Sequence, residues 1–516
     1  MAEIILLTES KISSDFNKYD EVAKATDATR RDDVLPHDTH LSIVLLGSIL
    51  KEHNYDVKLI DNFLHLKKQF KQLEQELDKG PMAVGISTTF FYDNRSLQEL
   101  VSMIRSRSPG SCIILGGPSL LQFSELIKLG DISVLYDGDE VIVKIMDSLK
   151  RGKKGLKDIP GIYIKENDTI HFTGERPPIE MDKIPFPDWE LMPKSRELVY
   201  PIETQRGCPY SCKYCTYPIY SLKGGRFRLK DNQKVIDEIK RNFEKYGIYR
   251  YRICDSNFTT PSKRALKLSE MIVKENLSIE WSCYGRVDNM GNELAFAMKE
   301  AGCKVIFIGI ESGSDVILRN MNKKFSRKQI YGGIESIKRA GISITGSFIV
   351  GFPGETEQTV MMTKEVILNS GLDCYLASFF WLDRNSPIWR ERETYGLTGS
   401  AMDWSHDTMD SNSARSYLSS LIDDVFREDG PPTGSDFDVV SLVNHGLSYE
   451  QALEFIRDRH QINRAKFMKK EGHNGKMLSD ERLKIIGARH SRAVMSLAKH
   501  YHSFQHDSVG SETVTM

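Results

Sequence analysis

The sequence predicts an α/β protein in which two successive sets of alternating strands and helices are followed by a helical region. Three observations lead to this fold class. Short apolar runs alternate with longer amphipathic segments over 1–150, the alternation begins again over 196–385, and helical segments replace it over 386–504. Strands separated by helices are typical of parallel sheets. We therefore predict a doubly wound N-terminal domain, a second α/β domain and a helical C-terminal domain.

The first region, residues 1–150, predicts an open, doubly wound (Rossmann-like) sheet. Its expected strands include EIILLT, VKLID, MAVGIST and CIILGG, and its expected helices include LSIVLLGSILKEH and SLQELVSMIRSR. Sheets of this kind bind ligands at the carboxyl ends of their strands. Small, hydroxyl and acidic residues collect there and are the candidate contacts: Ser87, Thr88, Gly116, Gly117, Gly138, Asp139 and Glu140.

The second α/β region, residues 196–385, is joined to the first by residues 151–195, which we expect to be a polar linker because its prolines exclude a long helix. Strands at regular spacing, each followed by a helix, predict a partial TIM-type (β/α)6 barrel. Barrel enzymes place catalytic groups at the carboxyl ends of their strands. The residues expected at these ends are Asp255, Arg286, Glu311, Ser312 and Gly351.

The C-terminal region, residues 386–504, is expected to be helical, and the tail 505–516 is expected to be disordered. Aromatic and charged side chains gather near its start. These residues either close the barrel mouth over a substrate and exclude water, or form a packing seam between barrel and helices. The sequence leaves both interpretations open for Trp381, Arg384, Trp389, Trp404 and His406.

Composition excludes some function classes. The 516 residues include 70 basic and 71 acidic side chains, so bulk charge does not favour binding to nucleic acid or to an anionic membrane. The N-terminus does not resemble a signal peptide, and no stretch approaches the roughly 18 apolar residues of a membrane span. We expect a cytoplasmic protein. Five cysteines stand singly and are expected to be small buried side chains: Cys112, Cys254, Cys283, Cys303 and Cys374.

The remaining three cysteines, Cys208, Cys212 and Cys215, have the spacing CxxxCxxC in the stretch RGCPYSCKYCTYP. Three thiolates on a short loop can hold three irons of a 4Fe-4S cluster, which leaves the fourth iron open to a small molecule. The alternative is a zinc site. Zinc sites usually close four ligands in CxxC pairs, and no partner pair or CxxH lies near this loop. The spacing therefore favours the cluster.

The cluster loop resembles that of the radical S-adenosylmethionine (radical SAM) enzymes. Tyr214 before the third cysteine and the RGCP lead-in at 206–209 both fit that family. The resemblance implies that the amino and carboxylate groups of SAM chelate the open iron. It also implies that an electron from the cluster cleaves SAM to a 5′-deoxyadenosyl radical, which abstracts a hydrogen atom.

The resemblance also implies roles for the residues at the barrel strand ends. Asp255 would meet the SAM amine and Arg286 the SAM carboxylate. Glu311 and Ser312 would contact the ribose and methionine parts, and the backbone at Gly351, in GSFIVGFPGET, would flank the adenine. The sequence departs from the family at Ser256, because the commoner pattern has a second acid after the position of Asp255.

A doubly wound domain ahead of such a barrel resembles the cobalamin-binding class, the class B radical SAM methyltransferases, over most of residues 40–385. The resemblance implies a corrinoid on the first domain, held at the strand-end contacts named above. A DxHxxG cobalt-binding signature is incomplete: Asp38, Thr39 and His40 are present, but Ile43 replaces the glycine. We expect His40 to be a solvated side chain and cobalt to be bound without a protein histidine.

Together these resemblances predict a cobalamin-dependent radical SAM methyltransferase. Many members of the class use methylcobalamin and a 5′-deoxyadenosyl radical to methylate an unactivated carbon or a phosphorus centre. The substrate would be a biosynthetic small molecule or a peptide, and the reductant a protein such as flavodoxin or ferredoxin. One alternative is a radical SAM oxidative cyclase or rearranging enzyme. An alternative of another class is a non-catalytic sensor that binds a metal and a corrinoid.

Overall fold

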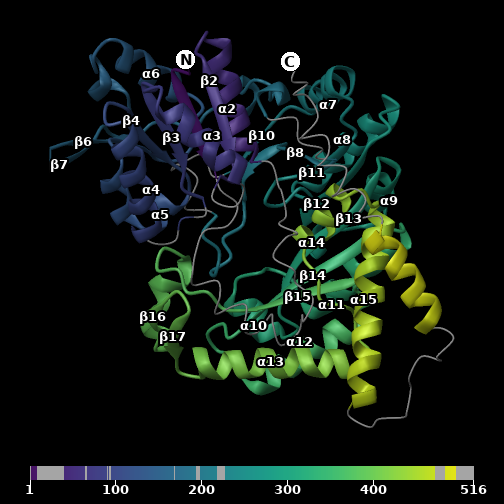
Figure 1. Cartoon of the computed structure of the whole chain (residues 1–516). Coiled ribbons are helices and arrows are strands. Elements are labelled where there is room, and N and C mark those ends of the chain that lie inside the picture. Colours follow the sequence, from purple (N-terminus) through teal and green to yellow (C-terminus); the bar gives the residue numbers. More distant parts are fainter. Residues whose placement is uncertain are drawn as a thin grey trace. The chain divides into compact units, whose positions relative to one another are not determined.

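The structure is a computed structural model that divides into two compact units. It describes residues 2–8, 40–63, 67–89, 91, 94–167, 169–192, 198–217, 227–470 and 483–495. The first unit comprises Met1–Ser195, Glu203–Tyr210 and Thr216–Arg241, and the second comprises Arg196–Ile202, Ser211–Cys215 and Asn242–Met516. The predicted five-part division stays a prediction, and the expected disordered tail, 505–516, lies outside the described residues. Figure 1 shows the chain with many of its elements labelled.

The first unit contains a seven-stranded sheet, its helices and a short hairpin. The sheet strands are β1 (Ile4–Thr8), β2 (Val57–Asp61), β3 (Ala83–Ser87), β4 (Cys112–Gly116), β5 (Ile132–Val134), β6 (Ile162–Glu166) and β7 (Thr169–Phe172). The α-helices are α2 (Leu41–Glu52), α3 (Lys67–Leu77), α4 (Asn94–Arg107), α5 (Ser119–Gln122) and α6 (Ile142–Lys150). The hairpin consists of β9 (Gln205–Gly207) and β10 (Phe227–Leu229). Helix α7 (Asn232–Tyr246) follows the hairpin.

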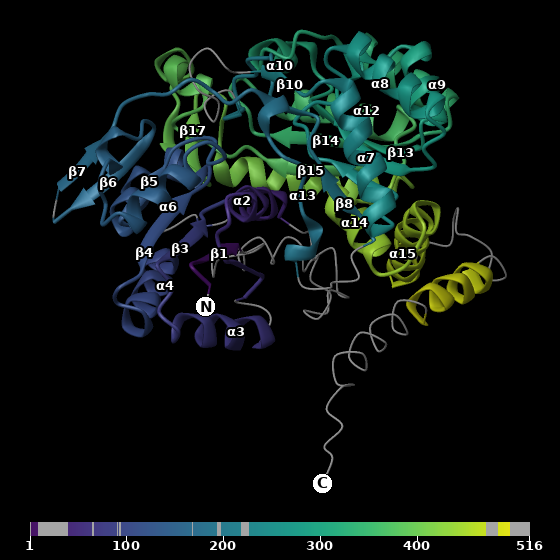
Figure 2. The ribbon, with the colours of Figure 1, turned by 90° about the horizontal axis from the view of Figure 1, so that it is seen from above.

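The sheet has the order β2-β1-β3-β4-β5-β6-β7, and its first five strands are parallel. The strand order reverses between β1 and β3, and the crevice at such a switch point is where open α/β sheets bind ligands. The predicted doubly wound fold is confirmed. The expected linker differs from the structure, because β6 and β7 add two antiparallel strands to the sheet edge (Figure 2).

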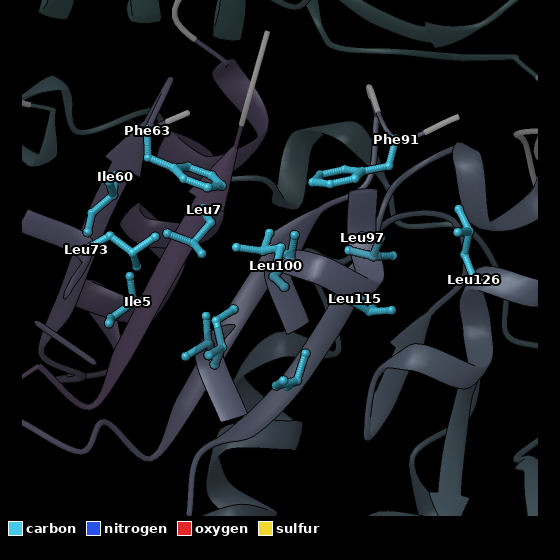
Figure 3. Close-up of a cluster of buried hydrophobic side chains, with 14 of the residues drawn as sticks. Ile5, Leu7, Ile60, Phe63, Leu73, Phe91, Leu97, Leu100, Leu115 and Leu126 are labelled. Atoms are coloured by element: carbon cyan, nitrogen blue, oxygen red, sulfur yellow. The ribbon is translucent and has the colours of Figure 1, made fainter. Parts of the chain in front are cut away.

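The core of this unit follows from the two-residue period of its strands. Alternate residues of β1 and β4, Ile5 with Leu7 and Ile113 with Leu115, face one apolar cluster. Helices α3 and α4 close this cluster (Figure 3) through Leu73, Leu77, Leu97, Leu100 and Ile104. Helix α2 packs against β2, where a Cβ at Gly47 would lie 3.0 Å from Leu59 Cδ2. Helices on both faces hold the strand ends in fixed positions.

The second unit contains the barrel strands and all later elements. The strands are β8 (Tyr200–Ile202), β11 (Arg250–Ile253), β12 (Glu280–Gly285), β13 (Cys303–Glu311), β14 (Ser343–Val350) and β15 (Cys374–Phe379). The helices between them are α8 (Ser262–Lys274), α9 (Asn292–Glu300), α10 (Asp315–Asn320), α11 (Arg327–Arg339) and α12 (Glu357–Asn369). The later elements are η6 (Pro387–Tyr395), β16 (Thr398–Ser400), β17 (Asp403–His406), β18 (Met409–Asp410), α13 (Ser411–Arg427), α14 (Asp436–Asn444) and α15 (Tyr449–Lys470).

The six barrel strands are parallel and lie in chain order, β15-β14-β13-β12-β11-β8. Each consecutive pair is joined through at least one helix, and the connection from β8 to β11 also contains the hairpin of β9 and β10 before α7. The arrangement confirms the predicted α/β class with a partial (β/α)6 barrel. Because all six strands run in one direction, their carboxyl ends meet at one edge, and the predicted site residues are brought to that edge.

The C-terminal elements pack against the barrel strands of the same unit. Val305 and Phe307 of β13 join Val440, Tyr449 and Leu453 of α14 and α15 in one apolar cluster. The region is not helical throughout, because β16, β17 and β18 form a small antiparallel sheet. No helix within the described ranges has both the length and the apolarity needed to cross a bilayer.

The turn after β14 contains a buried carboxyl group. Glu355 is 0% exposed, and its Oε2 accepts a hydrogen bond from the backbone N–H of Gly351. Its Oε1 has no hydrogen-bond partner within the part of the chain that the structure describes. Burial raises the pKa of Glu355 to about 8, and the backbone hydrogen bonds from Gly351 and Phe352 only partly oppose it. The side chain is therefore largely protonated at neutral pH.

The raised pKa of Glu355 makes the stability of the fold depend on pH. The folded protein holds this proton to a higher pH than the unfolded chain, so the free energy of unfolding should fall as pH rises from about 4.5 to about 8. We expect Glu355→Gln to remove this loss, which amounts to a few kcal/mol at most, on the order of 1.4 kcal/mol per pH unit. Urea titrations followed by circular dichroism at several pH values measure it. Glu357→Gln, at an exposed glutamate, is the control. If the free energy of unfolding changes equally with pH in both variants, the prediction is contradicted.

Candidate functional site

The predicted barrel residues lie where the strands end. Asp255 follows β11, Arg286 follows β12, Glu311 ends β13 and Gly351 follows β14. Asp255 and Arg286 are buried, as is Glu311. Charged groups seldom occupy such positions without partners, so their partners define the site.

The part of the cluster loop that belongs to the second unit is held by backbone hydrogen bonds. Lys213 donates its N–H to Met321 O at 2.9 Å and accepts from Ile388 N at 2.9 Å. Asn322 Nδ2 donates to Ser211 O at 2.9 Å. The Cys215 N–H donates to Cys212 O at 3.1 Å, which closes a tight turn between two of the three cysteines. The loop is thus fixed to the end of α10 and to the start of η6.

Arg286 connects this loop to the end of β12. Its Nη1 donates toward Cys212 Sγ at 3.8 Å. Its Nε and Nη2 donate to the two carboxylate oxygens of Asp288 at 2.9 and 3.0 Å, and Nη2 also donates to Lys323 O. The guanidinium lies 5.1 Å over the Phe325 ring. A fork held on several sides loses little further freedom when it meets a carboxylate.

Glu311 forms a buried cluster with Tyr214 and Lys323. The Tyr214 hydroxyl donates to Glu311 Oε1 at 2.8 Å, and Lys323 Nζ donates to the same oxygen at 3.3 Å. Lys323 Nζ also donates to Tyr214 Oη at 3.2 Å and to Gly309 O at 2.8 Å. Burial and the Glu311 charge raise the pKa of Tyr214 well above its usual value, so its hydroxyl stays a donor.

The backbone at Glu311 is strained. Its φ is +73°, which is rare for a residue with a side chain and tends to occur at functional sites. A side chain on Gly309 would force the Glu311 carboxylate out of its position. Sequence reasoning found Glu311 and Tyr214 but missed Lys323, because the two lysines in the loop between α10 and α11 belong to no motif. Its burial beside a carboxylate is the signal that identifies it.

Ser312 is buried and shapes the loop that follows β13. Its Oγ accepts from the Ser314 N–H at 3.1 Å and lies 3.3 Å from Thr363 Oγ1. Thr363 Oγ1 also accepts from the Gly313 N–H at 2.9 Å. These contacts fix the chain directly after Glu311. Contacts of Asp255, Arg286, Glu311, Ser312 and Tyr214 with SAM stay predictions.

Gly351 is packed against the small C-terminal sheet. Its φ is +95°, and a Cβ there would lie 2.6 Å from Trp404 Cη2 and 2.8 Å from Ala414 Cβ. His406 Nε2 lies 3.1 Å from Gly351 O, and the Trp404 and His406 rings stack at 5.3 Å. Burial lowers the pKa of His406, which leaves the ring neutral at pH 7. These contacts favour the packing-seam interpretation for Trp404 and His406.

Arg384 and Trp389 contact each other, with the guanidinium 5.1 Å from the ring centroid. Arg384 Nε also donates to Gly399 O at 3.1 Å. Neither contact distinguishes a barrel mouth from a packing seam. That choice stays open for these two residues and for the partly exposed Trp381.

The three cysteines that are predicted to bind the cluster do not all belong to one unit. Cys208 follows β9 in the first unit, whereas Cys212 and Cys215 belong to the second. Among the described residues no three His, Cys, Asp or Glu side chains are gathered as a ready metal site. The donor set still fits iron-sulfur chemistry, because none of the eight cysteines, all of which are described, forms a disulfide and thiolates are the usual ligands of such clusters. Ligation by all three cysteines stays a prediction.

The other cysteines do not resemble ligands. Cys112, Cys283, Cys303 and Cys374 are buried, as predicted, while Cys254 is partly exposed. Burial raises the pKa of both Cys112 and Cys374 to about 12. These two thiols therefore stay protonated and are poor metal ligands.

In the first unit, the predicted corrinoid contacts lie at the carboxyl ends of β3 and β4. The Thr88 N–H and Oγ1 donate to Gly116 O at 2.7 and 3.2 Å, and Ser87 Oγ lies 3.0 Å from Thr89 Oγ1. Gly117 has φ +127°, and a Cβ there would lie 3.0 Å from Thr88 N. At the end of the neighbouring strand β1, the buried Thr8 Oγ1 has no hydrogen-bond partner within the described ranges. Small residues and an unsatisfied hydroxyl at a switch point fit a large flat ligand.

His40 differs from the expected solvated side chain. It is only 13% exposed, and its Nε2 lies 4.0 Å from Asp61 Oδ1 at the end of β2. The other two residues of the partial signature, Asp38 and Thr39, lie outside the described residues. Binding of cobalt without a protein histidine stays a prediction.

The loop after β5 carries Gly138, Asp139 and Glu140. Both carboxylate oxygens of Asp139 accept from Arg206, at 2.7 and 3.1 Å. Burial alone would raise the pKa of Asp139, but the Arg206 charge and hydrogen bonds outweigh it and hold that pKa below its usual value. Glu140 Oε2 lies 3.7 Å from Arg176 Nη1. Direct contacts of these residues with a corrinoid stay predictions.

Comparison with known proteins places this chain in a family. The model of the radical SAM superfamily matches residues 202–367. An uncharacterized methyltransferase of Pyrococcus horikoshii is 31% identical over 336 residues, which is 63% of this chain and 72% of that protein. Other relatives are named as methyltransferases or methylases, as a putative methylthiotransferase and as magnesium-protoporphyrin IX monomethyl ester cyclases.

Solved structures share the fold of this chain. The radical SAM methyltransferase TsrM of Kitasatospora setae, with cobalamin and a 4Fe-4S cluster bound, has a TM-score of 0.68 at 14% identity and covers 90% of this chain and 100% of its own. The cobalamin-dependent SAM radical enzyme OxsB, with aqua-cobalamin and SAM bound, has a TM-score of 0.65 at 16% identity, over 99% of this chain and 82% of its own. The predicted resemblance is confirmed: the chain belongs to the radical SAM superfamily and has the fold of its cobalamin-dependent members.

Proposed function

We propose that this protein is a cobalamin-dependent radical SAM methyltransferase that acts on a small molecule or a peptide. The observation that carries the proposal is the buried set of charges, Arg286, Glu311 and Lys323, beside the cluster-loop residues Cys212 and Tyr214. SAM carries an ammonium, a carboxylate, hydroxyls and a sulfonium, so its site needs both acids and bases at fixed positions. The barrel edge provides both.

The residues of the barrel edge would bind and orient SAM. A 4Fe-4S cluster, when bound at Cys208, Cys212 and Cys215, supplies the electron that cleaves SAM to a 5′-deoxyadenosyl radical. Arg286 presents donors beside Cys212, where the SAM carboxylate is expected. Glu311 is aimed by Tyr214 and Lys323, so its carboxylate can accept from ribose hydroxyls without first reorganising.

The first unit would hold the corrinoid at its switch point. A corrinoid, when bound there, relays a methyl group that SAM supplies to a substrate carbon or phosphorus atom that is too poor a nucleophile to attack SAM. The chain's own contribution is a set of small residues and hydroxyls, including Thr8, Thr88 and Gly117, which let a flat ring approach the strand ends.

The proposal requires an electron donor and a reducing compartment. Cluster thiolates and the single cysteines must stay reduced, which favours the cytoplasm. A low-potential protein such as flavodoxin or ferredoxin would supply the electron. Bulk charge near neutrality gives no reason to invoke nucleic acid as a partner.

Two other functions are kept as alternatives. A radical SAM oxidative cyclase or rearranging enzyme would use the same barrel edge, and relatives that bear a cyclase name keep this alternative open. A non-catalytic sensor would bind metal and corrinoid only. Such a sensor has no need of Arg286 and Glu311 beside the cluster loop.

Removing the cluster ligands should abolish SAM cleavage. We expect Cys212→Ala to lower the bound iron after anaerobic reconstitution and to reduce 5′-deoxyadenosine formation to background, because a cluster with two protein thiolates is poorly held. Iron analysis and mass spectrometry measure both. Cys254→Ala, outside the loop, should leave both unchanged. Reductive cleavage of SAM by a variant that lacks all three loop cysteines, or tetrahedral zinc in the purified protein, would refute the cluster.

Lys323 should control the affinity for SAM through Glu311. Lys323→Met leaves Glu311 buried without its cation, so we expect the dissociation constant for SAM to rise about tenfold or more, about 1.4 kcal/mol, together with a loss of stability. Equilibrium dialysis on reconstituted protein measures the affinity. Adding Glu311→Gln should recover stability without recovering affinity.

The matched control for this test is Lys304→Met. Lys304 pairs with Glu280 and Glu450 near the amino end of β13, away from the barrel edge. Its removal should leave the affinity for SAM unchanged. Equal losses in affinity for both lysine variants would contradict a specific role of Lys323.

The products of SAM distinguish the two enzyme functions. With candidate substrates, a dithionite or flavodoxin reductant and added hydroxocobalamin, we expect S-adenosylhomocysteine and 5′-deoxyadenosine to form together, because methyl transfer and radical formation each consume SAM. Mass spectrometry quantifies both. Turnover of a substrate that yields 5′-deoxyadenosine without S-adenosylhomocysteine would favour the cyclase or rearranging enzyme and refute the methyltransferase.

A further inference from the structure

Two arginines lie directly opposite each other in the hairpin that precedes the first cluster cysteine. Arg206 of β9 pairs in register with Arg228 of β10. Like charges at opposed positions of an antiparallel pair destabilise it. Asp137 lies between them: its Oδ1 accepts from Arg206 Nη1 at 3.2 Å and its Oδ2 from Arg228 Nη1 at 2.6 Å. The hairpin therefore depends on a carboxylate that is about 70 positions away in the chain.

Arg206 is held on two further sides. Its Nη1 and Nη2 donate to the two oxygens of Asp139 at 2.7 and 3.1 Å, and its Nε donates to both oxygens of Glu203 at 2.9 Å. The side chains of Arg206 and Asp139 are 15% and 6% exposed. A planar guanidinium bound by two forks in a nearly dry environment has one orientation. This geometry fixes β9, which ends one residue before Cys208.

The loop that supplies the two carboxylates is itself fixed. It follows β5 at the carboxyl edge of the doubly wound sheet, where the corrinoid contacts Gly138 and Glu140 are predicted. Arg176 Nη2 donates to Leu135 O at 3.1 Å and also to Asp137 O. Arg228 Nη1 donates to Ile179 O at 3.0 Å as well. Within the first unit, one ion network thus links the sheet edge to the strand that leads to a cluster ligand.

We propose that Arg206 is a positioning residue that couples the corrinoid-binding edge of the first unit to the cluster through Asp137 and Asp139. The proposal rests on the function proposed above and deepens it. Asp139 then acts through Arg206, because both of its oxygens accept hydrogen bonds from the guanidinium. Binding at either end shifts the same loop and strand, so each site affects the affinity of the other.

The test measures the coupling in each variant as the ratio of two dissociation constants for cobalamin, one without the cluster and one with it. The dissociation constant of hydroxocobalamin is determined by equilibrium dialysis for full-length protein without the cluster and for the same protein after reconstitution. We expect wild-type protein to bind cobalamin about fivefold more tightly, or better, when the cluster is present. In Arg206→Gln and in Asp139→Asn the ratio should fall to about one. Arg206→Lys keeps the charge without the fork and should give an intermediate ratio.

Arg105→Gln is the matched control. Arg105 Nη2 donates to Asp131 Oδ2 at 2.5 Å at the amino end of β5, so this variant removes a similar ion pair at the opposite end of the strand. Its ratio should equal that of wild type, even if its stability falls. Because the ratio compares one variant with itself, a general loss of stability does not imitate loss of coupling.

The outcomes separate the two proposals. Failure of wild-type protein to bind cobalamin in either state overturns the proposed function. If wild-type protein binds cobalamin equally well with and without the cluster, the coupling is overturned but the proposed function is not. The same holds if Arg206→Lys and Asp139→Asn keep the full ratio of wild-type protein. If Arg206→Gln does not fold, judged by circular dichroism, the other two variants decide.

Discussion

Buried charge at the barrel edge must be paired inside the protein, and the geometry of the site depends on this constraint. An unpaired charge in such a place costs several kcal/mol, so a charge there is kept only where partners surround it. Lys323 meets this requirement with three acceptors, and Arg286 meets it with the Asp288 carboxylate and a backbone carbonyl. The groups that would meet SAM are therefore oriented before SAM arrives, and binding need not reorganise them.

The same constraint applies in the first unit, where it shapes the entry to the cluster loop. Arg206 and Arg228 would repel each other across β9 and β10, but Asp137 accepts a hydrogen bond from each and offsets the repulsion. The cluster loop is consequently anchored twice. Cys208 follows a strand fixed by ion pairs, whereas the turn at Cys212 is fixed by backbone hydrogen bonds to the segment after α10. The three sulfurs that are predicted to bind one cluster thus depend on two unrelated sets of interactions.

Sequence reasoning predicted the features that are local in the chain. Strand ends follow from hydrophobic period, so the places of Asp255, Arg286 and Glu311 could be predicted, and the CxxxCxxC spacing indicated the chemistry. It missed what depends on contacts between distant segments. Nothing near Lys323 indicates that Glu311 will be its partner.

Other misses have equally physical causes. Strands β6 and β7 were not expected because residues 151–195 were interpreted as a polar linker whose prolines exclude a long helix. His40 was expected to be solvated because a lone histidine between a strand and a helix usually is, whereas its neighbour Asp61 lies two elements further along the chain. In both cases the structure depends on contacts between distant segments, and neither the composition nor the hydrophobic periodicity of the sequence predicts such contacts.

The barrel edge is divided electrostatically between its strands. At β12 and β13 the groups are charged, and the polar ends of SAM are expected there. At β14 the two groups that hold the Gly351 peptide are Glu355, largely protonated at neutral pH, and His406, a neutral ring. The turn expected beside the adenine is thus fixed by hydrogen bonds without a net charge. An uncharged heterocycle needs no counter-ion, while a charge at β14 would compete for the ammonium or carboxylate of SAM. If SAM binds along this edge as proposed, burial that keeps Glu355 protonated would favour one orientation of SAM there.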